Sequence, residues 1–73
     1  MDYKIDVGFY DDASDVGQIR TYYRALEKYD AKGIGHEKTR TSTMFLSSDK
    51  PLNIRQLTKD LEDIKILSVR KVA

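Results

Sequence analysis

The sequence predicts an α+β domain in which a four-stranded antiparallel sheet carries two helices on one face. Two observations support this prediction. Segments with strand-like composition and segments with helical spacing of apolar residues follow one another in a fixed order, and each half of the chain contains one helical segment between strands. The order is strand, helix, strand, strand, helix, strand, which is that of a ferredoxin-like βαββαβ fold. Its 73 residues form a single domain, residues 1–73.

The first strand is predicted at residues 3–10, because apolar and polar side chains alternate strictly there. One set is expected to face the core and comprises Tyr3, Ile5, Val7 and Phe9. The other set is expected on the opposite face and comprises Lys4, Asp6, Gly8 and Tyr10. A turn follows at residues 11–13.

The first helix is predicted at residues 14–28. Its apolar residues are spaced by three, four and three positions and are expected to face the sheet: Val16, Ile19, Tyr23 and Leu26. Asp15 is the expected N-cap, with Gln18 as the reciprocal partner of a capping box, and Ser14 is the alternative cap. The pair Lys32–Gly33 is typical of a helix end.

Two strands are predicted next, at residues 34–40 and 41–48, with the turn near residues 39–42. The first is polar, as an edge strand can be, and the second is rich in β-branched and apolar residues.

The second helix begins at Asn53, an N-cap followed by Gln56 in capping-box spacing. Its apolar stripe comprises Ile54, Leu57, Leu61 and Ile64. A last strand is predicted at residues 66–72.

The composition of the chain excludes several classes of function. The chain has 13 basic and 12 acidic residues, a net charge of +1, which argues against a nucleic-acid partner held mainly by phosphate contacts. There are no cysteines, so a disulfide frame or a thiolate zinc site is excluded. No apolar run approaches the ~20 residues that span a bilayer, and the first residues lack the features of a signal peptide. We therefore expect a cytoplasmic domain that does not itself insert into a membrane.

The turn before the first helix is the candidate ligand site, comprising Asp11, Asp12, Asp15 and Gly17. Carboxylates on a tight turn can hold Mg²⁺ or Ca²⁺, but turn formation and helix capping account for these aspartates equally well. A ligand that carries a carboxylate and an amine is the other option, with backbone amides near Gly17 binding the carboxylate. Glycine in a first turn lowers helix stability, which suggests that a ligand or another chain approaches the backbone there. We predict no resident metal or cofactor.

The sheet face away from the helices is the candidate interaction surface, and its predicted residues are Tyr10, Thr43, Phe45 and Ser47. An uncovered face with aromatic residues is a typical docking site, and the alternative is a merely solvated face. RNA binding is disfavoured, because the segment around Phe45 lacks the pattern of RNA-binding sheets. His36 is the only histidine, which disfavours a zinc site. No catalytic constellation is present, so we predict that the protein is not an enzyme.

The segment Asp15-Val16-Gly17-Gln18-Ile19 resembles the loop–helix motif of ACT-like domains, although it lacks their proline. Residues 57–70 are similar to the helix, turn and strand that end such domains. The resemblance implies a small regulatory domain of a type that often pairs. Within that group the chain is similar to the cytoplasmic C-terminal domain of MgtC/SapB-type bacterial membrane proteins, which implies attachment to a membrane portion.

Together these features predict a non-enzymatic regulatory or interaction module. It would dock a protein partner, or a second copy of itself, through the open sheet face, and would sense a small molecule at the first strand–helix junction. The alternative is a stand-alone adaptor or inhibitor, such as phages and mobile elements encode.

Overall fold

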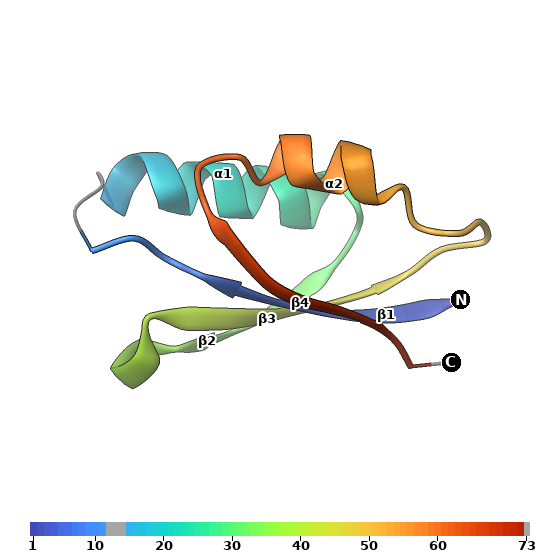
Figure 1. The fold of residues 1–73 in the computed structure, drawn as a ribbon, viewed down its shortest axis with the longest axis horizontal. Coiled ribbons are helices and arrows are strands. Elements are labelled where there is room, and N and C mark those ends of the chain that lie inside the picture. The colour runs from blue at the N-terminus through green and yellow to red at the C-terminus, as the bar shows by residue number, and fades with distance from the viewer. Residues whose placement is uncertain (12–14, 73) are drawn as a thin grey trace.

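The computed structural model describes residues 1–11 and 15–72. Its elements are β1 (Asp2–Gly8), α1 (Asp15–Lys28), β2 (Lys32–His36), the 3-10 helix η1 (Glu37–Thr39), β3 (Thr41–Ser47), α2 (Ile54–Asp60) and β4 (Lys65–Lys71). The four strands form one sheet in the order β2-β3-β1-β4, and all neighbours are antiparallel. Both helices lie over the same face of this sheet (Figure 1). The predicted α+β ferredoxin-like arrangement is confirmed.

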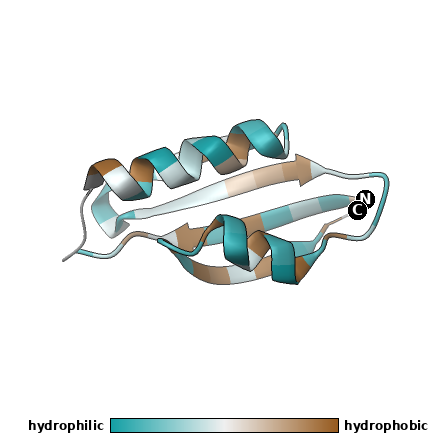
Figure 2. Cartoon of the chain, turned by 90° about the horizontal axis from the view of Figure 1, so that it is seen from above, coloured by the Kyte–Doolittle hydropathy of each residue, from teal (hydrophilic) through white to brown (hydrophobic). Residues whose placement is uncertain are grey.

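The core lies between the sheet and the helices, and both layers contribute hydrophobic residues to it (Figure 2). The alternation in β1 correctly predicted its inward residues, because Ile5 and Val7 are fully buried and Tyr3 nearly so. Met44 and Leu46 of β3 face the same way. The second helical segment contributes Leu57, Leu61 and Ile64, and α1 contributes Tyr22 and Ala25.

The predicted core stripe of α1 is wrong at three of its four positions, and only Leu26 packs against the core. Val16, Ile19 and Tyr23 keep 66%, 49% and 62% of their surface exposed. The helix instead buries Gln18, Tyr22 and Ala25 against the sheet. Polar contacts select this face, because a hydrogen bond of 2.5 Å joins the Tyr22 hydroxyl to Ser42 Oγ on β3. Three large apolar side chains are consequently left on the surface of α1.

The ends of α1 also differ from the prediction. Gln18 does not act in a capping box, because its amide binds the backbone of Tyr10. Ser14 lies outside the described residues, as does the side chain of Asp15. The helix ends at Lys28, and the chain turns through Asp30, whose φ of 50° is left-handed. Lys32–Gly33 therefore opens β2 instead of ending the helix.

The connection between β2 and β3 begins earlier in the chain than predicted. β2 ends at His36, and η1 with Arg40, which has a φ of 51°, makes the turn. At α2, Asn53 is confirmed as N-cap, since its Oδ1 accepts a hydrogen bond of 3.0 Å from the Gln56 backbone N–H. The reciprocal half of that capping box is wrong, because the Gln56 side chain donates to Asp60. Ile54 is exposed instead of joining the core.

Candidate functional site

The face of the sheet opposite the helices, the outer sheet face, carries side chains from all four strands. The strand register places Lys4 of β1 opposite Phe45 of β3, and Asp6 opposite Thr43. The orientation predicted for Thr43, Phe45 and Ser47 is therefore found, while their role in an interface stays a prediction. The outer sheet face comprises Asp2, Lys4, Asp6, Lys32, Ile34, His36, Thr41, Thr43, Phe45, Ser47, Lys65, Leu67, Ser68 and Arg70.

A hydrogen-bonded row crosses the outer sheet face at its centre. The Asp6 carboxylate accepts hydrogen bonds from Thr43 Oγ1 at 2.7 Å and from Ser68 Oγ at 2.9 Å. Since the single hydroxyl proton of Thr43 goes to Asp6, the Nε2 of His36, at 3.2 Å, donates to Thr43. The row thus connects β2, β3, β1 and β4. The hydrogen bonds from Thr43 and Ser68 lower the pKa of Asp6 below its ordinary value of 3.8.

This row is expected to make the free energy of unfolding depend on pH. Asp6→Asn is expected to lower the free energy of unfolding at pH 7 by about 1 kcal/mol, because an amide cannot accept hydrogen bonds through both of its terminal atoms. A carboxylate whose pKa is lower in the folded state stabilises above about pH 4, and this contribution is lost as the pH falls through the folded pKa. The difference from wild type should therefore shrink at about pH 2.

Urea unfolding at both pH values measures this effect. Asp49→Asn is the matched control, because Asp49 is exposed, and it should change neither curve. An equal loss at both pH values for Asp6→Asn would show that the carboxylate charge is not what stabilises the row.

Apolar and basic side chains surround this row. Ile34, Phe45 and Leu67 come from β2, β3 and β4, and they keep 55%, 40% and 53% of their surface exposed. Leu67 lies at the irregularity between β4 and β1, where its side chain packs over Gly8. Four cations occupy the same face: Lys4, Lys32, Lys65 and Arg70.

The predicted interface residues differ in their accessibility. Phe45 and Ser47 are exposed, whereas Thr43 is 6% exposed and its hydroxyl is hydrogen-bonded to Asp6 and His36. Ser47 donates a hydrogen bond of 2.5 Å to Asp2. Tyr10 follows β1, and Lys65 Nζ lies 4.8 Å from the centre of its ring. Thr43 and Ser47 thus donate hydrogen bonds to the carboxylates of this face. Phe45 and Tyr10 are the residues whose side chains a partner could contact. Sequence reasoning missed Ile34 and Leu67. The strand register places Ile34 opposite Thr43 and so diagonal to Phe45, whereas Leu67 packs over Gly8, toward the other end of the sheet.

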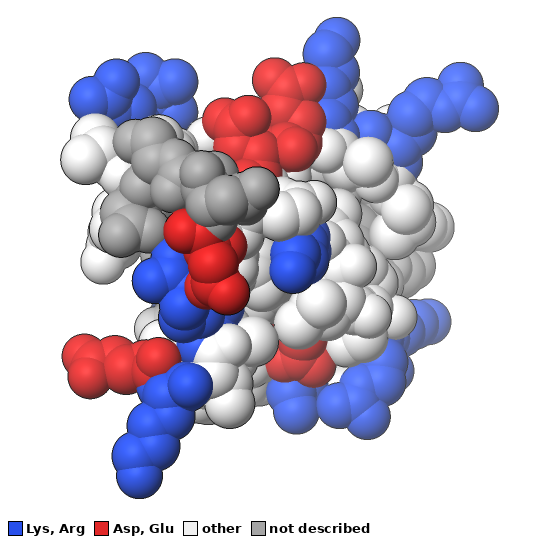
Figure 3. Space-filling model, turned by 60° about the vertical axis from the view of Figure 1, so that its left-hand side comes forward, with Lys and Arg blue, Asp and Glu red and all other residues white. Residues whose placement is uncertain are grey.

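The junction between β1 and α1, where a ligand was predicted, is held by Gln18. This buried side chain accepts a hydrogen bond from the Tyr10 N–H at 2.6 Å and donates one to the Tyr10 carbonyl at 3.0 Å. The exposed Asp11 carboxylate lies 2.8 Å from Nε of Arg40. Asp12 lies outside the described residues, and Asp15 begins α1. Acidic and basic side chains are interspersed at this end of the molecule (Figure 3).

Gly17 has free space beside it. Apart from its chain neighbours and the backbone of its own helix, no heavy atom of residues 1–11 and 15–72 lies within 4 Å of the position that a Cβ would take, so packing among these residues does not account for this glycine. A depression of about 370 Å³ lies close by, between the start of α1 and the β2–β3 turn, and is lined in part by Phe9, Ile19 and Gly35. Sequence reasoning missed it because η1 was not predicted. The ligand-binding role of the junction stays a prediction.

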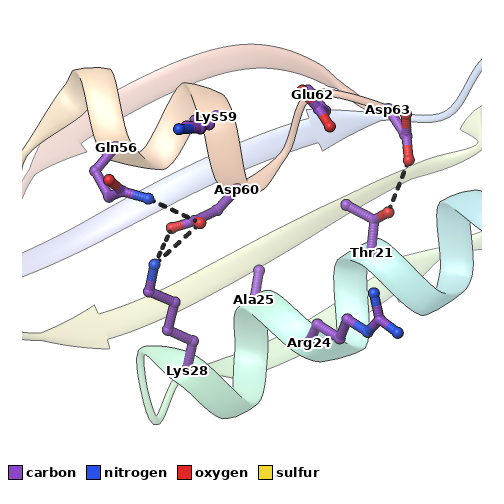
Figure 4. Close-up of a pocket in the computed structure, with 9 residues that line it drawn as sticks. All are labelled: Thr21, Arg24, Ala25, Lys28, Gln56, Lys59, Asp60, Glu62 and Asp63. Atoms are coloured by element: carbon purple, nitrogen blue, oxygen red, sulfur yellow. Dashed lines mark hydrogen bonds and ion pairs between the residues drawn. The ribbon is translucent and has the colours of Figure 1, made fainter.

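A second hollow, of about 560 Å³, separates the two helices (Figure 4). It is bridged by contacts between α1 and the second helical segment. Lys28 Nζ binds the Asp60 carboxylate at 2.9 Å, and Thr21 donates to Asp63 at 3.0 Å. Burial would raise the pKa of Asp60, but hydrogen bonds from Tyr29, Lys28 and Gln56 lower it below its ordinary value. These bridges connect the two helical segments across the hollow, which Arg24, Lys59 and Glu62 also line.

A scan against protein-family models gave no match, and searches of curated proteins and of solved structures also gave none. The resemblance to ACT-like domains therefore stays a prediction. No helix in the described part of the chain has the length and apolar character needed to cross a membrane. Among residues 1–11 and 15–72, no group of three or more acidic or histidine side chains could hold a metal ion.

Proposed function

We propose that this domain is a non-enzymatic interaction module whose outer sheet face docks an acidic protein partner. The observation that supports this best is the pair Ile34 and Phe45, exposed apolar residues that are diagonal neighbours on β2 and β3, with Leu67 of β4 exposed farther along the same face. Apolar side chains grouped on a face that nothing else covers are typical of interaction sites. Phe45, on a central strand, is the natural anchor, because aromatic side chains contribute most to such contacts.

The charge of this face indicates the chemistry of the partner. Its two carboxylates, Asp2 and Asp6, already accept hydrogen bonds from hydroxyl groups of neighbouring strands. The ion pairs found in the described residues, Lys28–Asp60 and Arg40–Asp11, lie away from this face. Lys4, Lys32, Lys65 and Arg70 are therefore available to acidic groups of a partner, and complementary charge speeds association and fixes orientation.

A protein partner fits this surface better than RNA. Sheets that bind RNA stack bases on aromatic residues of both central strands. Here β3 provides Phe45, but the outward positions of β1 are Lys4, Asp6 and Gly8. The carboxylate of Asp6 at the centre of the face also repels phosphate. Acidic peptides that carry an aliphatic or aromatic residue match both features of the surface.

A displayed random-peptide library, selected on the wild-type domain, tests this proposal. The enriched peptides are expected to be acidic with an apolar anchor. Their affinity should fall by about tenfold or more for Phe45→Glu, which places a charge at the centre of the contact. Ile54→Glu is the matched control, because Ile54 is equally exposed but lies on α2. It should leave the affinity unchanged.

Two outcomes would overturn the proposal. One is a set of enriched peptides without acidic bias. The other is binding that Phe45→Glu leaves intact, with amide shifts in NMR spectra that lie outside β1 and β3.

A further inference from the structure

We propose that β2 and the adjacent side of α1 form a homodimer interface, across which a second copy of the chain continues the sheet. This surface shares β2 with the outer sheet face but uses the backbone edge of that strand, and it does not depend on the function proposed above. β2 is an edge strand, and all five of its residues are exposed. An edge strand with free backbone groups is a template for pairing with another strand.

The two edges of the sheet are protected to different degrees. β4 has a register shift opposite Asp6 and Val7, and it carries Lys65, Arg70 and Lys71. Both features deter edge pairing. β2 carries a single lysine, Lys32, pairs with β3 without any shift, and contains two glycines, Gly33 and Gly35. The β2 edge is therefore the open one.

The backbone of β2 presents its free groups at these glycines. The hydroxyl of Ser42, on β3, donates to the carbonyl of Ile34 at 2.9 Å, so that carbonyl points toward β3. Successive carbonyls of a strand point to opposite sides. The carbonyls of Gly33 and Gly35 consequently point away from the sheet, at positions where no side chain hinders an approaching strand.

The side of α1 that flanks β2 is apolar and uncovered. Val16, Ile19 and Tyr23 are exposed, and they continue toward Leu26, which is partly buried and lies 3.2 Å from the position of a Gly33 Cβ. This contact places the stripe over β2. A second copy paired along β2 would bring its own α1 against the same stripe and would cover these side chains from water, which a domain this small needs.

A single two-fold axis can pair the β2 strands of two copies and also bring their α1 helices together. Gly33 lies under Tyr22 and Leu26, and Gly35 lines one depression with Ile19, so Ile34 lies under the middle of α1. Antiparallel pairing about Ile34 places Lys32 opposite His36 of the second copy. The same axis passes near Tyr23, so the two α1 helices meet antiparallel at their centres.

Charge complementarity indicates that the partner bound at β2 and α1 is a second copy of the chain. Arg20 and Glu27 stand three residues before and four residues after Tyr23. In an antiparallel pair of α1 helices centred at Tyr23, Arg20 of each copy lies beside Glu27 of the other. The contact is thus self-complementary and occurs twice, as an isologous interface requires.

Sedimentation velocity over a range of concentrations tests the dimer and its geometry. The wild-type chain is expected to dimerise. Arg20→Glu places like charges together twice and should raise the dimer Kd by about tenfold or more. The double variant Arg20→Glu with Glu27→Arg restores opposite charges and should return the Kd to within about threefold of wild type. At about 1 M salt the effect of Arg20→Glu should largely disappear.

Further variants locate the interface. Tyr23→Glu should give a folded monomer, and Phe45→Glu, on the outer sheet face, should leave the dimer intact. A wild-type chain that stays monomeric up to about 1 mM, a concentration at which even weak dimers form, would overturn the proposal. So would a dimer that Phe45→Glu disrupts and Tyr23→Glu does not, or a double variant that fails to restore the Kd.

Discussion

Replacing Gln18 with alanine is expected to lower the free energy of unfolding by about 2–3 kcal/mol. Gln18 is 2% exposed, and its amide makes two hydrogen bonds to one residue, with the N–H and the carbonyl of Tyr10. The substitution leaves the Tyr10 N–H without this partner, whereas the Tyr10 carbonyl keeps a hydrogen bond of 3.3 Å from Arg40 Nη2, and it opens a cavity beneath α1. Unsatisfied polar groups and cavities each destabilise a fold, so the two effects add.

Urea unfolding measures the loss, and amide hydrogen exchange at Tyr10 locates it. Gln56→Ala is the matched control, because it also removes a helical glutamine, one that is exposed and whose side chain binds Asp60 at 3.1 Å. It should cost less than about 0.5 kcal/mol, as surface changes usually do. Similar losses for the two variants, or unchanged exchange at Tyr10, would contradict the role given to Gln18.

The strands could be predicted from the sequence because their signal is local. In β1 the side chains alternate strictly, and a core on one face of a sheet needs nothing more than that alternation. Tyr3, Ile5 and Val7 were placed correctly for this reason. The same holds for Met44 and Leu46 in β3.

The buried face of α1 could not be predicted in the same way. The helix has two stripes with helical spacing, one through Val16, Ile19 and Tyr23 and another through Tyr22 and Ala25. Apolarity favours the first, but the second is buried. The difference comes from Gln18, whose polar side chain lies in the core because it has backbone partners at Tyr10. A periodicity of apolar residues cannot detect such partners.

The candidate site was predictable only in part. The outward orientation of Phe45 follows from alternation in β3. The row through Asp6 depends on the pairing of β1 with both β3 and β4, including the register shift that places Ser68 opposite Asp6. No local pattern encodes that register. The edge position of β2 was predicted, but its start was not, because Lys32–Gly33 was read as the end of a helix.

Gly33→Ala is expected to lower the free energy of unfolding by about 1–3 kcal/mol, as overpacking does. The added Cβ would overlap the Tyr22 hydroxyl and would lie 3.0 Å from the ring carbon that carries it. Tyr22 cannot yield easily. Its hydroxyl binds Ser42, and its ring packs edge-on against Phe9, with 5.8 Å between ring centres. A shift of the ring would therefore weaken both contacts.

Thermal and urea unfolding of Gly33→Ala measure this cost, and Gly35→Ala is a close control. Both glycines lie in β2, but a Cβ at Gly35 meets no atom within 4 Å. Alanine there restricts the unfolded chain and should leave stability unchanged or raise it by up to about 1 kcal/mol. Equal losses of unfolding free energy for Gly33→Ala and Gly35→Ala would mean that the β2 backbone itself requires glycine, and that the contact with Tyr22 is not the cause. A loss confined to Gly33 shows that the Tyr22 hydroxyl, placed on the sheet by Ser42, selects the buried face of α1 and so leaves Val16, Ile19 and Tyr23 exposed beside the open edge.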